Sequence, residues 1–162
     1  MNKHHSTIES SHLDVKDQLE TQIRDAFSFH SQCEFEIGDQ TASYLEDLTL
    51  FDTATQKQIV PYLMILVLRM GITNVPDGEQ LLFFLDGAEL KRDKSGELRS
   101  RNSRSQAEVQ YIEATLSSYS SAQINSIIEW LKFISRGPLW GFLPDVVDSC
   151  LFYWSLKKSK RG

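Results

Sequence analysis

The run IVPYLMILVL, Ile59 to Leu68, is the longest apolar stretch of the chain and decides its fold. Ten residues are too few to cross a bilayer, which takes about 20. From Tyr62 to Leu68 a helix would be apolar on every side, and such a helix lies buried at the centre of its domain. Pro61 predicts either a kink or a break into two helices, because it removes one hydrogen bond and crowds the preceding turn. We therefore expect a domain wrapped around this segment.

Apolar residues at three- and four-residue spacing predict further helices on both sides of the run. Asp52 is suited to cap the central helix and Gly71 to end it after Met70. The other helices are expected at about Leu13–Phe29, Thr41–Leu50, Gly78–Leu85, Ser105–Ser117, Ser120–Ile134 and from Pro144 onward.

Three faces of these helices are expected to be buried. They are Val15, Leu19, Ile23, Ala26 and Phe27 in the first helix; Leu81 to Leu85, as core or as a dimer interface; and Val146, Val147, Cys150, Leu151, Phe152 and Trp154 in the last. The fold class is all-α: an irregular domain of six or seven helices with little or no sheet. A small two-stranded excursion could turn at Lys94–Glu97.

A chain of 162 residues fits a single domain. The polar residues 1–12 predict a disordered N-terminal tail, residues 13–156 the helical domain with a basic loop at about 90–105, and residues 157–162 a basic C-terminal tail. No secretory signal and no CxxC pair is present, so we expect a cytoplasmic protein with reduced Cys33 and Cys150, and no membrane association.

The segment 91–104 carries a local charge of +4 in a chain whose net charge is −5, since six basic residues there face two acidic ones. These cations could neutralise nucleic-acid phosphates. The acidic chain, the lack of interleaved aromatics and the absence of a recognition-helix signature argue against this alternative. The candidate anion or nucleic-acid contacts are Lys91, Arg92, Lys94, Arg99, Arg101 and Arg104.

The loop PLWGFL, residues 138–143, gathers large apolar side chains between two prolines. Trp140 and Phe142 are candidate contacts for a protein partner, since exposed apolar patches mark such sites. The alternative is that they plug the core as a lid between the last two helices.

Residues suited to catalysis or metal binding do not form a recognisable constellation. His4, His5 and His12, or His30 with Cys33, lack the second tight ligand pair of a zinc site. Asp145 and Asp148 lie in a helical first turn without a companion for general acid–base work. No nucleophile elbow and no glycine-rich phosphate loop occurs. We expect no enzyme, no metal and no cofactor.

Four short patterns occur in order along the chain: Ile-x-x-Ala-Phe in the first helix, a Leu-Pro-x-Leu-like core helix, a Gln-containing helix with an apolar-Leu-x-Phe pattern, and a last helix closing on Tyr-Trp. The matching residues are Ile23, Ala26 and Phe27; Val60, Pro61, Tyr62 and Leu63; Gln123, Ile127, Trp130, Leu131 and Phe133; and Tyr153 and Trp154. In this order the chain resembles a family of small bacterial α-helical proteins that form a domain of unknown function. The resemblance implies a helical fold and a bacterial source, but it implies no activity. It does not extend to the basic segment that begins at Lys91.

The leading hypothesis is a non-enzymatic bacterial protein-interaction or accessory protein, an immunity or regulatory role being one version. The alternative is a nucleic-acid-associated protein that uses residues 91–104. Whether the chain forms homo-oligomers stays open.

Overall fold

The computed structural model describes residues 3–34, 52–75, 78–86, 90–92, 94–95, 98–100, 105–137 and 143–161. The helices are α1 (Lys3–Phe27), α3 (Thr53–Met70), the short 3-10 helix η2 (Ile72–Asn74), α4 (Gly78–Leu85), α5 (Gln106–Ser117), α6 (Ser121–Ser135) and α7 (Leu143–Arg161). One further helical turn covers residues 31–34. Strands β1 (Leu90–Arg92) and β2 (Leu98–Ser100) form a small antiparallel hairpin. The predicted all-α fold class is confirmed, and the helix expected at 41–50 lies outside the described residues.

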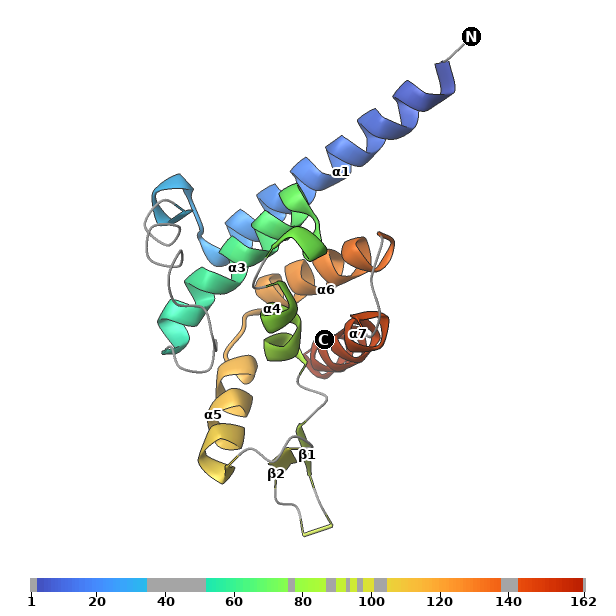
Figure 1. The fold of residues 1–162 in the computed structure, drawn as a ribbon. Helices are drawn as coiled ribbons and strands as arrows, with labels where there is room; N and C mark the ends of the chain where they lie inside the picture. The colour runs from blue at the N-terminus through green and yellow to red at the C-terminus, as the bar shows by residue number, and fades with distance from the viewer. Residues whose placement is uncertain are drawn as a thin grey trace.

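Helix α3 is the centre of the domain. It is flanked by α1 and α4, while α6 packs between α1 and α7 (Figure 1). Its residues Leu63, Met64 and Ile65 are almost fully buried, as the sequence predicts, whereas Tyr62 and Leu66 are half-buried. The helix runs from Thr53 to Met70 with Pro61 inside it, so of the two predicted alternatives, a kink or a break into two helices, the break does not occur.

The capping predictions for α3 are confirmed at both ends. The Asp52 side chain accepts a hydrogen bond of 2.7 Å from the backbone N–H of Thr55, and this bond lowers the pKa of the Asp52 carboxyl. At the other end Gly71 has a φ of 84°, which strongly favours glycine.

Two indole groups connect the helices to each other. Trp130 of α6 donates from Nε1 to the carbonyl oxygen of Met64 at 3.0 Å, and Trp154 of α7 donates from Nε1 to that of Leu85 at 2.9 Å. Both side chains are fully buried, so these bonds satisfy polar groups that would otherwise cost about 1–3 kcal/mol each. Helix α4 is therefore core: apart from Phe83, its apolar residues are buried.

The N-terminus differs from its prediction, because α1 begins at Lys3 and residues 3–12 are helical rather than disordered. In Figure 1 this part of α1 extends away from the other helices. No Gly or Pro interrupts Lys3–Phe27, and each residue added to a helix already formed gains one backbone hydrogen bond. The packed part of α1 around Leu19 and Ile23 can therefore propagate the helix toward the N-terminus.

The C-terminus also differs from its prediction. Residues 157–161 are not a separate tail, because they form the last turns of α7. Arg161 donates to the carbonyl oxygens of Tyr119 and, at 2.8 Å, of Ser117, while Lys57 of α3 donates to that of Ser118 at 2.9 Å. Lys157 adds a bond of 3.1 Å to the Ser117 hydroxyl. These cations meet the C-terminal end of α5, where carbonyls lack helical partners and carry partial negative charge.

Phe152 corrects the predicted buried face of α7. Val147, Cys150 and Trp154 are buried as expected, but Phe152 is 65% exposed on the opposite side of the helix. Cys150 donates to the carbonyl oxygen of Leu82 at 3.4 Å, and both it and Cys33 are free thiols, as predicted.

We predict that Arg161→Ala lowers the free energy of unfolding by about 1 kcal/mol, because two carbonyl oxygens at the end of α5 lose a charged donor. Urea denaturation at neutral pH and low protein concentration measures the effect. Lys160→Ala is the matched control at an exposed basic residue on the outer side of α7 and should change stability by less than about 0.5 kcal/mol. Equal losses in the two variants would contradict a specific role for Arg161.

Candidate binding groove

An apolar groove of about 630 Å³ lies between α1, the C-terminal end of α3, η2 and the C-terminal end of α6. Its volume falls within the range of about 300–1,000 Å³ that is usual for ligand sites. The described lining is mainly apolar and comprises Val15, Val67, Leu68, Met70, Ile72, Phe133 and Ile134, with Lys16, Gly71, Thr73, Asn74, Arg136 and Gly137.

The groove exists because α3 stops abruptly at Met70. The chain reverses at Gly71, where the backbone N–H donates to the carbonyl oxygen of Val67 at 2.8 Å and closes the helix. Asn74 then donates from its side-chain amide to the carbonyl oxygen of Met70 at 2.7 Å, which holds η2 against the helix end. A Cβ at Gly78 would lie 2.8 Å from the carbonyl oxygen of Ile72, so this close approach of α4 to η2 requires glycine.

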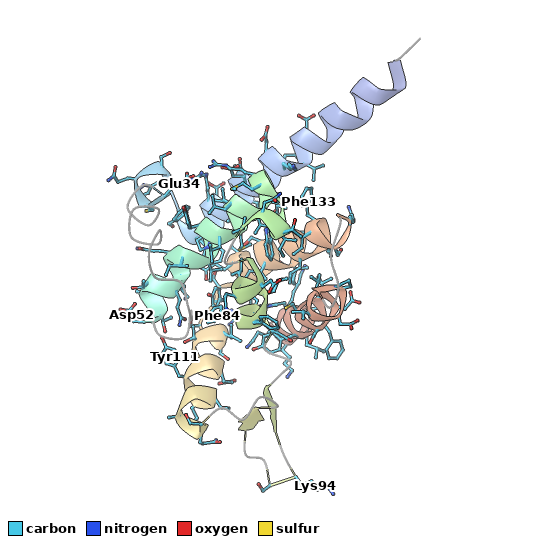
Figure 2. The ribbon with its side chains drawn as sticks, in the orientation of Figure 1. Glu34, Asp52, Phe84, Lys94, Tyr111 and Phe133 are labelled. Atoms are coloured by element: carbon cyan, nitrogen blue, oxygen red, sulfur yellow. The ribbon has the colours of Figure 1, made fainter. Side chains whose placement is uncertain are left out.

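Apolar side chains are exposed at the sides of the groove. Val15 is 46% exposed and Met70 51%, although both belong to helices that bury their other apolar residues. Phe133 is half-buried and lies beside the C-terminal end of α3 (Figure 2). Ile72 and Ile134 are buried below them. Apolar surface exposed beside an apolar floor is typical of a binding site for another apolar group.

Lys16 and Arg136 are the charged groups among the described lining residues. Neither side chain forms an ion pair with any residue that the structure describes. The groove therefore combines an apolar interior with two cations and no described carboxylate, which favours a ligand that carries negative charge beside its apolar part.

A ring of four charged side chains fixes α1 against α3 close to the groove. Arg24 and Arg69 each donate to both Glu20 and Glu34, at 2.7–2.9 Å for the four ion pairs. Partial burial acts to raise the pKa of Glu34, but hydrogen bonds from Arg24 and Arg69 outweigh it and hold that pKa below its usual value. Since Arg69 directly precedes Met70, the ring holds one wall of the groove in place.

Most of the candidate contact residues named from the sequence lie outside the described residues or in the β1–β2 hairpin. Trp140, Phe142, Arg101 and Arg104 lie outside the described residues. Lys91 and Arg99 are register partners in the β1–β2 hairpin, with Arg92 opposite Leu98. Lys94 lies exposed at the hairpin turn, far from α1 (Figure 2).

The other polar candidate residues form no catalytic or metal-binding cluster among the residues that the structure describes. Asp145 and Asp148 are both exposed on α7. Cys33 lies with its sulfur 3.4 Å from Nε2 of His30, but no group of three or more possible metal ligands occurs among the residues described. Within the same part of the chain, no helix combines the length and apolarity needed to span a bilayer.

The sequence reasoning missed the groove as a site. Val15 follows the apolar spacing of its helix, which predicts burial, and Met70 ends the apolar run of α3. The available signal was Gly71 directly after Met70, since a helix end next to an apolar side chain leaves part of that side chain uncovered.

We predict that Glu34→Gln lowers the free energy of unfolding at pH 7 by about 1 kcal/mol, a modest value because the ring touches solvent. The folded-state pKa of Glu34 is lowered, so its contribution is complete above the unfolded-state pKa of about 4.3 and is lost as pH falls through the folded-state value. Urea denaturation at pH 7, 5 and 3 should therefore show wild type and variant converging in acid.

Asp14→Asn, an exposed change on the same helix α1, is the control for this series and should give no comparable difference. A constant gap between wild type and Glu34→Gln at every pH would show that the ring does not act through the Glu34 charge.

Comparisons of the chain with protein-family models, with characterised proteins and with solved structures found no match.

Proposed function

We propose that this chain is a non-enzymatic protein-interaction domain that binds an apolar segment of a partner protein in the groove between α1, α3 and α6. The observation that supports this is the exposure of Val15 and Met70 at the sides of an apolar groove. Exposed apolar surface raises the free energy of the isolated protein, and a partner that covers it recovers about 25 cal/mol per Å².

The chemistry of the groove specifies the partner segment further. A groove between helices suits an amphipathic helix that inserts side chains at three- and four-residue spacing. Lys16 and Arg136 favour carboxylates flanking those apolar side chains. An accessory, immunity or regulatory protein of bacterial type, which acts by covering a surface of its partner, is one form of this function.

Trp140 and Phe142 stay candidate contacts for the same partner. They follow Gly137, a lining residue of the groove, by three and five positions in the sequence.

The test is a selection of random helical peptides of about 16 residues on the intact protein, with removal of those that also bind Met70→Asp. Selected peptides should carry apolar residues at helical spacing with Asp or Glu beside them. Their affinity, measured by fluorescence anisotropy, should fall at least about tenfold in Met70→Asp or Val15→Asp, because a charge enters an apolar contact.

Leu156→Asp is the matched control for this test. It makes the same kind of change at an exposed apolar residue of α7, which contributes no described lining residue, and should leave peptide binding unchanged. Peptides that bind all variants equally, or that are rich in Lys and Arg, would contradict the proposal.

A nucleic-acid-associated function is the second candidate. The observation in its favour is the β1–β2 hairpin, whose register sets Lys91 opposite Arg99. Basic residues paired in this way can contact phosphates without reading sequence.

For this alternative we predict that a labelled DNA duplex of about 20 base pairs binds at 50 mM salt and loses affinity by about 100-fold at 200 mM, as expected for about four neutralised phosphates. The triple change Lys91→Glu, Lys94→Glu and Arg99→Glu should abolish binding, whereas Met70→Asp should not affect it. Absent binding at 50 mM, or binding that salt does not weaken, would exclude the alternative.

A further inference from the structure

The outer face of α7 carries large apolar side chains that no described part of the domain covers. Phe152, at 65% exposure, is the most exposed large hydrophobic residue in the described structure, and Leu156 one turn later is 43% exposed. The opposite face of the same helix is fully packed, with Val147, Cys150 and Trp154 buried. A helix packed on one side normally presents a polar outer face, so this one departs from the expected pattern.

Charges flank the two apolar residues with opposite sign at the two ends of the stripe. Asp145 and Asp148 precede Phe152 by seven and four residues, and Lys160 follows it by eight. All three side chains are exposed, and none forms an ion pair with a residue that the structure describes. Lys57, Lys157 and Arg161, by contrast, are turned inward onto the end of α5.

We propose that the exposed face of α7 pairs with the same face of a second copy of this chain, in an antiparallel arrangement with the two-fold axis beside Phe152. The stripe is complementary to itself only in this direction. A parallel pair would set Asp145 and Asp148 against their own copies and Lys160 against its own copy. An antiparallel pair sets the acidic end of each helix against the basic end of the other, as an isologous interface requires.

The spacing along the helix fits this arrangement. At about 1.5 Å per residue, Asp145 and Lys160 lie about 10 and 12 Å on either side of Phe152. The flexible lysine side chain spans this difference of about 2 Å. The rotation fits as well, at about 100° per residue. Asp145 and Lys160 fall on the same flank of Phe152 as Leu156, about 20° and 80° round the helix from Phe152. Lys158 lies about 120° round on the other flank, where it borders Ser121, Ile124 and Asn125 of α6.

In an antiparallel two-fold pair each flank meets the same flank of its copy. The geometry therefore allows the ion pair Asp145–Lys160, formed twice, once at each end of an interface that has the two Phe152 side chains at its centre. A single helix pair buries less than the roughly 800 Å² per partner of a typical stable complex. The dimer is therefore weak and reversible, with a Kd of about 0.1 mM.

The test is sedimentation equilibrium of the full chain from about 10 µM to 1 mM, which brackets this Kd. Wild type should pass from monomer to dimer, and Phe152→Glu should remain monomeric. Asp145→Lys turns two attractive pairs into two repulsive ones and should weaken the dimer about tenfold. The double change Asp145→Lys with Lys160→Asp restores both pairs and should recover the wild-type Kd.

Phe83→Glu is the matched control, because Phe83 is 42% exposed on α4 and lies outside the stripe; its dimer should be unchanged. Circular dichroism and urea unfolding verify that each variant is folded. A wild type that stays monomeric at about 1 mM, ten times the expected Kd, would overturn the proposal. So would a dimer that survives Phe152→Glu, or charge changes whose effects the double variant does not reverse.

Discussion

The burial of α3 is the constraint on which the other helices depend. A helix with apolar side chains on all sides must be covered on all sides, and α1, α4 and α6 provide that cover. Trp130 fixes how α6 does so, because its indole N–H has one protein acceptor in the described structure, the carbonyl oxygen of Met64 in the middle of α3. Helix α7 packs along α6, so the position of α6 sets that of α7. Trp154 of α7 then donates a hydrogen bond to the last residue of α4, Leu85.

The cations at the end of α7 divide into two groups with different consequences. Lys157 and Arg161 lie on the inner side, where they bind oxygen atoms at the α5–α6 connection and stabilise the tertiary structure. Lys160 lies on the outer side and remains available to another molecule. Successive residues of a helix point about 100° apart. Within one run of basic residues, some side chains therefore stabilise the tertiary structure, whereas others are exposed to solvent.

Both candidate surfaces arise where apolar side chains of a helix lie outside the part of that helix that packs against the core. Met70 is the last residue of α3, and the reversal at Gly71 leaves it without a neighbour on one side. Val15 precedes the part of α1 that packs, and Phe152 lies on the outer face of α7. Apolar side chains at such positions contribute little to stability, which makes their exposure informative about binding.

The sequence alone determined the all-α class, the central helix, and the limits of α3, α4 and α6, because these depend on local signals. Asp52 and Gly71 act through hydrogen bonds within a few residues, and apolar spacing marks the faces of each helix. The basic hairpin was also foreseeable from the turn at Lys94–Glu97. Spacing could not decide whether Val15 and Phe152 are covered, since that depends on how far each neighbouring helix extends.

Only the tertiary structure decided the rest. The sequence reads residues 157–161 as a solvated tail, because nothing local shows that the end of α5 lies within reach of Arg161. The ring of Glu20, Arg24, Glu34 and Arg69 joins three segments, and no spacing rule connects them. The groove likewise needs α1, α3 and α6 to be placed together. Local patterns specify which residues a helix can bury, whereas the contacts between distant segments determine which of them are left exposed.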